Sequence, residues 1–230
     1  RRIGSARPWE AVASLFYSYP VEVHAAHVVE QALELASSLT PHRLHYIPPT
    51  LPLDPAAERW AEQELARRGV RGFALLHPGA GWGAKRWPAA RYGEVAHALA
   101  GRGVTPLVNH GPEEQALAHE VVRASGGAAA AIACSISELI ALMRRAKLAI
   151  GGDTGPLHLA AALEVPIVAL YGPTDPRRTG PFGTQAIVLR SEISKISHKR
   201  SDVTDPGLLA LTAAQVIAAA QSLLEAPRGS

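Results

Sequence analysis

The feature that most constrains the fold is a regular alternation, from Phe73 onward, of short apolar runs and longer stretches with helical periodicity. Aliphatic strands that alternate with helices are typical of a parallel sheet covered on both faces. The sequence therefore predicts the α/β class. The predicted strands are 73–76, 104–108, 129–133, 147–150, 167–171 and 186–189, and the predicted helices are 88–102, 113–124, 137–145 and 154–163.

The segment before Phe73 is organised differently. The proline-rich stretch 48–55 suits neither a helix nor a central strand, and we interpret it as an interdomain linker. Upstream, a helix is predicted over 23–39. Because about 50 residues cannot hold a core unaided, residues 1–47 are expected to be the C-terminal remnant of a domain whose beginning is absent, an expectation with which the missing initiator methionine agrees. Residues 56–230 are expected to form the second, ligand-binding domain.

Composition excludes several classes of function. Apolar residues make up 47% and charged residues 19% of the chain, and no apolar run reaches the length of about 18 residues that a bilayer span needs. The net charge is only +3, without a block of like charges, which favours a phosphate-bearing ligand over nucleic acid. The chain has a single cysteine, Cys134, which favours a reducing cytoplasm. Its thiol is expected to be packed and unreactive.

Glycine and polar residues gather after four of the predicted strands. In an open parallel sheet, ligands bind beyond the carboxyl ends of the strands, where loops and helix N-termini converge. One shared crevice is therefore the economical explanation for these clusters. The four loops are 77–87, 109–114, 151–158 and 172–178.

The chemistry that suits such a crevice is recognition of a diphosphate. Glycines in 151–155 let the backbone approach a ligand closely, and the helix predicted to begin near Thr154 directs free N–H groups and its positive dipole end toward the crevice. Thr154 adds a hydroxyl, and Lys85 adds a mobile ammonium group that neutralises a phosphate.

Each of these residues also has a purely structural interpretation. Asp153 or Thr154 can cap the following helix, and His158 can be a satisfied buried histidine. Glu114 stands at a helix start, where the dipole stabilises a carboxylate, although a carboxylate there is also the usual partner of ribose hydroxyls. The aromatic rings of Trp82 and Trp87 can stack on a ligand, but core packing is the commoner fate.

These motifs resemble the heptosyltransferases of lipopolysaccharide assembly, glycosyltransferases of the two-domain GT-B architecture. The longest matches are 153–163 and 171–176; shorter ones are 77–88 and 111–114. The resemblance covers 73–183 well and the helix around 27–30 more weakly. It implies a Rossmann-like donor-binding C-terminal domain with a partial N-terminal domain.

The resemblance also implies a reaction and a set of site residues. The reaction is inverting transfer of a heptose-type sugar from an ADP-sugar to a lipopolysaccharide core or related glycolipid. No metal or other cofactor is implied, because a lysine and a helix dipole stabilise the leaving group. By position, Lys85 would contact phosphate or sugar, and Glu114, or its neighbour Glu113, would contact the nucleoside. Asp153 would hold sugar hydroxyls. The diphosphate would be bound by Thr154, Gly155 and His158.

Two departures from the family pattern leave alternatives open. The family's catalytic base is an aspartate in an early loop of the N-terminal domain, and the sequence before the linker has no counterpart, so the chain alone is expected to bind donor without transferring it. Segment 191–205 carries basic residues where many relatives carry cysteines, and this difference leaves the identity of the acceptor open. The basic residues are Lys195, His198, Lys199 and Arg200. The alternatives are a non-catalytic nucleotide-sugar-binding domain and a sugar-nucleotide epimerase of the same architecture.

Aromatic residues cluster near the start of the chain, at Trp9, Phe16, Tyr17 and Tyr19. Burial against the missing half of the first domain is the favoured explanation, and contact with a lipid acceptor or membrane surface is the other. The expected location is the cytoplasm, with peripheral contact to the inner membrane as the alternative.

Overall fold

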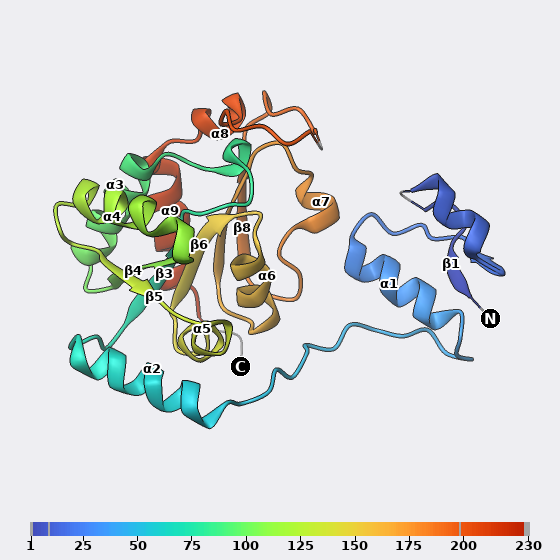
Figure 1. Ribbon diagram of the computed structural model, residues 1–230, viewed down its shortest axis with the longest axis horizontal. Helices are drawn as coiled ribbons and strands as arrows, with labels where there is room; N and C mark the ends of the chain where they lie inside the picture. Colours follow the sequence, from blue (N-terminus) through green and yellow to red (C-terminus); the bar gives the residue numbers. More distant parts are fainter. Residues whose placement is uncertain (1, 9, 198, 228–230) are drawn as a thin grey trace.

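The computed structural model describes residues 2–8, 10–197 and 199–227. Its main body is a parallel sheet flanked by helices, and the N-terminal segment lies apart from that sheet at the end of an extended connection (Figure 1). Within the described residues the main sheet has six strands in the order β5-β4-β3-β6-β7-β8. These strands are β3 (Phe73–His77), β4 (Thr105–His110), β5 (Ala130–Ala133), β6 (Leu148–Gly152), β7 (Ile167–Tyr171) and β8 (Ala186–Arg190).

Helices cover both faces of this sheet, as the alternation of strands and helices predicts. One face packs against α3 (Ala89–Ala100), α4 (Gln115–Ala124), α8 (Pro206–Ala210) and α9 (Ala213–Glu225). The other packs against α2 (Pro55–Arg67), α5 (Ile136–Met143) and α6 (Gly155–Ala162). Side chains of β3 alternate between the two cores: Leu76 faces the first, and Phe73 and Leu75 face the second. The α/β class and all of the predicted strands are confirmed.

Two helices that the sequence analysis left unassigned complete the cores. Asp54 accepts hydrogen bonds from the first amides of α2, and Pro55 is that helix's first residue rather than the end of the linker. Thr212 and Gln215 form a reciprocal capping pair at the start of α9. Both signals are legible in the sequence, because an N-cap residue followed by an apolar stripe marks a helix start.

The predicted helix 23–39 is shorter than expected. It forms α1 (Val28–Ser37), because the His27 ring accepts a hydrogen bond from the Val29 amide and caps the helix there. The amides of His24 and Ala25 instead donate to the Glu34 carboxylate, which keeps the preceding residues out of the helix.

The other N-terminal elements are short. They are β1 (Ile3–Ser5), the 3-10 turn η1 (Ala11–Phe16) and β2 (Tyr19–Val21), with β1 and β2 paired in parallel. Phe16 and Tyr19 are exposed within the described residues, Tyr17 packs over Gly4, and Trp9 lies outside the described residues. Neither burial against further chain nor membrane contact is tested here, and both stay predictions.

The proline-rich stretch contains no helix or strand before Pro55. It is nevertheless held against the main body, because the Arg144 guanidinium donates to the backbone oxygens of Leu51 and Pro52. The N-terminal segment also touches the main body: Phe182 packs its ring on those of His27 and Tyr46, with centroids 4.6 and 4.9 Å away. The division of the chain into the remnant of one domain and a second, ligand-binding domain stays a prediction.

Replacing Trp87 by alanine should destabilise the fold strongly. Trp87 is 2% exposed, packs edge-to-face on Tyr92, and donates from its indole nitrogen to the Leu211 oxygen at 3.0 Å. The expected loss in the free energy of unfolding, measured by urea denaturation, is about 3–5 kcal/mol from the cavity and the lost transfer energy. The matched control, Leu53→Ala at an exposed site, should change stability by less than about 0.5 kcal/mol.

Candidate active site

The carboxyl ends of β3, β4, β6 and β7 bring the four glycine and polar loops together at one edge of the sheet. The strands run parallel and in register, with His77 of β3 opposite Gly151 of β6 and Gly152 opposite Leu170 of β7. The loops that follow them therefore start side by side. The four loops thus gather at one edge, and three of them, 77–87, 109–114 and 151–158, line one cavity there.

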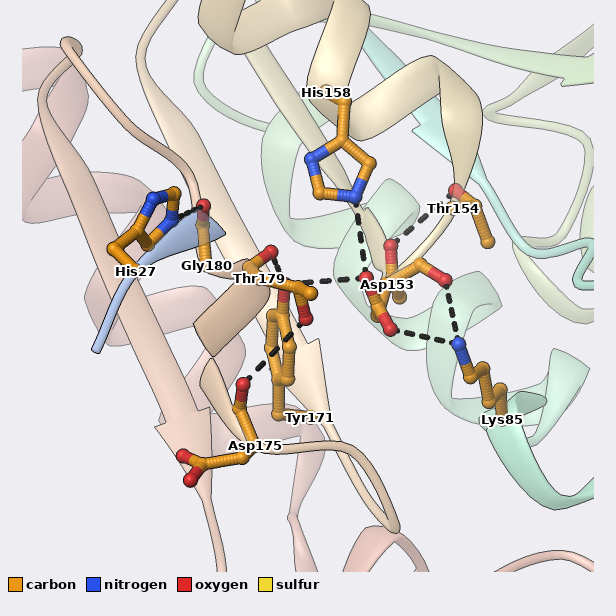
Figure 2. A network of polar contacts seen from close by, with 10 residues as sticks. His27, Lys85, Asp153, Thr154, His158, Tyr171, Asp175, Thr179 and Gly180 are labelled. Carbon is orange, nitrogen blue, oxygen red and sulfur yellow. Dashed lines mark hydrogen bonds and ion pairs between the residues drawn. The ribbon is translucent and has the colours of Figure 1, made fainter. Parts of the chain in front are cut away.

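An ion pair between Lys85 and Asp153 lies at the centre of this edge (Figure 2). Lys85 Nζ lies 2.7 Å from Asp153 Oδ2 and also donates to the Asp153 backbone oxygen. The side chains are only 13% and 9% exposed, so the pair is shielded from water more than a surface salt bridge is. The Lys85 ammonium also lies 4.7 Å from the centre of the Trp82 ring, a favourable cation–π arrangement.

Asp153 is a hub rather than a helix cap. Its other carboxylate oxygen, Oδ1, lies 3.2 Å from His158 Nε2 and 3.4 Å from the Tyr171 hydroxyl. Burial raises the pKa of this carboxyl, but the hydrogen bonds from His158 and Lys85 and the lysine charge outweigh burial and lower the pKa to about 2. Asp153 is therefore ionised at neutral pH. The structural interpretation of Asp153 as an N-cap is wrong.

Within the described residues, the first turn of α6 offers one free amide beside this pair, that of Gly155, because Pro156 has no N–H and the Leu157 and His158 amides donate to the Thr154 oxygen. Thr154 occupies the N-cap position with an extended backbone, but its hydroxyl donates to the Gly152 oxygen at 3.3 Å, and no side chain among the described residues caps the helix. A free amide at a helix N-terminus, with the positive end of the dipole, is suited to an anion. Gly155 is exposed at the start of α6.

His158 is also open to solvent. Its side chain is 48% exposed, so the interpretation as a satisfied buried histidine is wrong. Because the ring already faces Asp153, it lies on the ligand side of α6 (Figure 2).

A cavity of about 210 Å³ continues the site toward β4. Glu114 lines it, whereas the neighbouring Glu113 is exposed. The Glu114 carboxylate accepts from the Gly111 amide and lies so close to Gly79 that a Cβ at that position would collide with it. The cavity is lined by His77, Gly79, Ala80, Gly81, Asn109, Glu114, Thr154, Gly155 and Pro156.

Several larger hollows among the described residues lie away from this edge. One of about 530 Å³ borders 163–166 and 183–185, near the amino ends of β7 and β8, and one of about 420 Å³ lies between the N-terminal segment and Phe182. Size alone would favour them. The smaller cavity is the better ligand site, because it adjoins the buried ion pair, the uncapped helix and a carboxylate.

The 3-10 turn η2 (Gly83–Lys85), which we call the Lys85 turn, is held in place by a segment far along the chain. The Ala84 amide donates to the Ser201 oxygen, and the Ala84 oxygen accepts from the Asp205 amide. Gly83 packs so tightly on the Asp202 backbone that a side chain there would collide with it. Segment 201–205 therefore supports the site, a role that sequence reasoning did not assign because no local pattern indicates the pairing.

Trp87 and Cys134 have structural roles. Trp87 belongs to the core and Trp82 is half-buried beside Lys85, so core packing is confirmed for Trp87 only. Burial raises the pKa of the Cys134 thiol to about 12, in line with the unreactive, packed role predicted for it.

Tyr171, His77 and Asn109 were not predicted as site residues. Their positions at the carboxyl ends of strands were the signal that could have indicated them. No group of three or more metal-ligating side chains occurs within the described ranges.

The depressed pKa of Asp153 predicts a specific loss of stability in acid. Because the folded-state pKa of about 2 lies below the unfolded value of 3.8, the ionised carboxylate stabilises the fold above about pH 4. Asp153→Asn should therefore cost about 2 kcal/mol at pH 6, and about half of this difference should be gone at pH 3. Urea denaturation of both proteins at the two pH values measures it; a pH-independent difference would contradict the prediction.

Similarity to known proteins extends over most of the chain. The family model for glycosyltransferase family 9 (heptosyltransferase) matches residues 2–206. The chain is 32% identical over 186 residues to lipopolysaccharide heptosyltransferase 1 of Pseudomonas aeruginosa, covering 80% of this chain and 50% of that protein. It is 30% identical to lipopolysaccharide heptosyltransferase 3 of Escherichia coli, covering 90% and 63%. The chain thus spans about half to two thirds of the length of these relatives.

Solved structures have the same fold. A family 9 glycosyltransferase of Veillonella parvula superposes with a TM-score of 0.77 at 24% identity, over 91% of this chain and 64% of that one. An Escherichia coli heptosyltransferase solved with ADP gives 0.68 at 25% identity, over 96% and 65%. The parallel sheet is thus of the GT-B type found in these enzymes. Together with the family match over most of its length, these likenesses show that the chain belongs to glycosyltransferase family 9, the heptosyltransferases.

Proposed function

We propose that this chain binds a nucleoside-diphosphate sugar of the ADP-heptose type and forms the donor-binding part of an inverting glycosyltransferase that acts on the lipopolysaccharide core or a related glycolipid. The observation that carries the proposal is the buried Lys85–Asp153 pair beside the uncapped N-terminus of α6. The names of the relatives and the solved heptosyltransferase with ADP support the choice of donor.

The charges assign a task to each side chain. Lys85, the free Gly155 amide and the positive dipole end of α6 meet the diphosphate and stabilise the negative charge that develops when it leaves the sugar. Thr154 and Gly155 contribute a hydroxyl and an open approach at the same turn. His158, on the solvent side of Asp153, is within reach of the diphosphate as a hydrogen-bond donor.

Asp153 and Glu114 suit uncharged parts of the donor. Two carboxylates repel a diphosphate but accept hydrogen bonds well from vicinal hydroxyls. We assign Asp153 to hydroxyls of the transferred sugar and Glu114 to the nucleoside, at opposite ends of the diphosphate. Glu113 is the less suitable of the two neighbours because its side chain is exposed.

Transfer with inversion requires a base that deprotonates the acceptor hydroxyl as the diphosphate leaves. We propose that this base belongs to the N-terminal domain of the two-domain GT-B architecture and that residues 56–230 bind the donor. Family membership favours glycosyl transfer over the two alternatives, a non-catalytic binding domain and an epimerase. Incubation with ADP-heptose alone tests the latter, since an epimerase changes the donor without an acceptor.

A glycolipid acceptor would bring the protein to a membrane surface rather than through it. No helix in the described part of the chain has both the length and the apolar character of a bilayer span. We propose that the protein works in the cytoplasm at the inner face of the membrane that carries its acceptor. The single free cysteine agrees with a reducing compartment.

Loss of the Lys85 charge should weaken donor binding. In Lys85→Met the aliphatic stem is kept, and the affinity for ADP, measured by calorimetry, should fall about 10- to 100-fold because a buried charge-assisted contact is lost. Lys147→Met is the control, because Lys147 is exposed at the start of β6 on the opposite edge of the sheet. Equal affinity of wild type and Lys85→Met, or no binding of ADP or ADP-heptose by the wild type, would contradict the proposal.

Donor binding should not depend on a divalent metal. We propose that Lys85 and the N-terminal end of α6 supply the positive charge that a metal ion gives in other nucleotide-sugar enzymes. The affinity for ADP should therefore be the same after dialysis against EDTA and after addition of Mg²⁺ or Mn²⁺. An affinity that falls tenfold in EDTA and returns with metal would refute the metal-free proposal without affecting donor binding itself.

A further inference from the structure

His77 is a buried imidazole that contacts the Asn109 side chain but makes no hydrogen bond of normal geometry with it. It is the last residue of β3, on the same face as Phe73 and Leu75, and is 3% exposed. Neither of its ring nitrogens makes a hydrogen bond to any residue that the structure describes. Leaving a buried polar group unpaired costs about 1–3 kcal/mol, so such a group calls for a physical explanation.

The charge state of the ring limits what it can bind. Burial lowers the pKa of His77 to about 4, and a weak hydrogen-bonding contact with the Asn109 side chain on the adjacent strand raises it in part. At neutral pH the ring is therefore uncharged, with one nitrogen that donates and one that accepts. A hydroxyl group, which also donates and accepts, is complementary to it.

The surroundings of His77 direct it toward a ligand. The residue lines the cavity of about 210 Å³ together with Asn109, Glu114 and the first residues of α6. This volume is below the range of about 300–1,000 Å³ typical of a whole-ligand site, so the cavity is suited to one part of a larger ligand.

Charge decides which part of a nucleotide enters this cavity. The Glu114 carboxylate lines this cavity and repels a phosphate, whereas the Lys85 ammonium, paired with Asp153, lies outside the cavity lining. The diphosphate is thus drawn toward Lys85 and the N-terminal end of α6. What remains beside Glu114 and His77 is the uncharged, hydroxyl-bearing ribose.

We propose that His77 is a further binding residue of this site, and that its neutral imidazole hydrogen-bonds a ribose hydroxyl of the nucleoside diphosphate. This inference rests on the proposed binding of an ADP-type donor. It adds to the site a contact that discriminates ribose from deoxyribose, and it accounts for a polar ring kept unpaired inside the protein.

The test is a thermodynamic cycle that combines removal of the His77 imidazole with removal of one ribose hydroxyl. Calorimetry compares wild type and His77→Phe with ADP, 2′-deoxy-ADP and 3′-deoxy-ADP. Phenylalanine keeps the shape of the ring and removes both nitrogens, so ADP affinity should fall about tenfold, equivalent to about 1.4 kcal/mol. For the analogue that lacks the contacted hydroxyl, wild type and variant should bind equally.

Stability separates a ligand contact from a structural one. Because the ring nitrogens are unpaired in the free protein, His77→Phe should melt at the wild-type temperature or above it. His77→Gln, which keeps a donor and an acceptor, should recover part of the affinity for ADP. The control His97→Phe, in an exposed ring of α3 that contacts the Ser125 oxygen, should bind ADP like the wild type.

The outcomes are distinct. Equal binding of all three nucleotides by wild type and His77→Phe, an equal loss for all three, or a marked fall in melting temperature would each overturn the role of His77. Absence of ADP binding by the wild type would instead refute the proposed function, on which this inference depends.

Discussion

The common direction of the six strands is the constraint on which the site depends. Parallel strands all end at one edge of the sheet, so every loop that follows a strand starts there, and helices that begin just after the strands aim their positive ends at the same edge. Residues separated by 68 positions, such as Lys85 and Asp153, are brought to the same edge for this reason. Packing on both faces, by α3, α4 and α9 on one side and α2, α5 and α6 on the other, holds the edge rigid.

Electrostatics then divides that edge into two halves. On one half, Lys85 and the positive N-terminal end of α6, with the free Gly155 amide, surround a carboxylate that is itself kept ionised by its partners. On the other half, Glu114 and an uncharged His77 offer acceptors and a neutral donor. An anion with hydroxyl-bearing groups at both ends matches this division. The Lys85–Asp153 pair keeps both charges compensated in the free protein, which limits the cost of burying them.

The polar network around Asp153 also reaches the N-terminal segment. The Tyr171 hydroxyl donates to the Thr179 oxygen at 2.6 Å, and the next residue, Gly180, contacts the His27 ring with its backbone oxygen at 3.0 Å (Figure 2). The His27 ring accepts from the Val29 amide through Nδ1, so its other nitrogen carries the proton and donates to Gly180. One chain of contacts thus joins the capping residue of α1 to the hub of the site.

The sequence by itself determined the class of fold, the strands of the main sheet and the loops that form the site, because apolar periodicity and glycine clusters are local properties. The mutual approach of Lys85 and Asp153 followed from topology once a parallel sheet was predicted. What only the tertiary structure decided is which interpretation of each residue holds: Asp153 as a hub and not a cap, His158 as exposed, and Trp87 as core. The buried, unpaired state of His77 and the support of the Lys85 turn by 201–205 belong to the same group. Burial and hydrogen-bond pairing depend on segments far apart in the chain, and no local pattern encodes which of them come into contact.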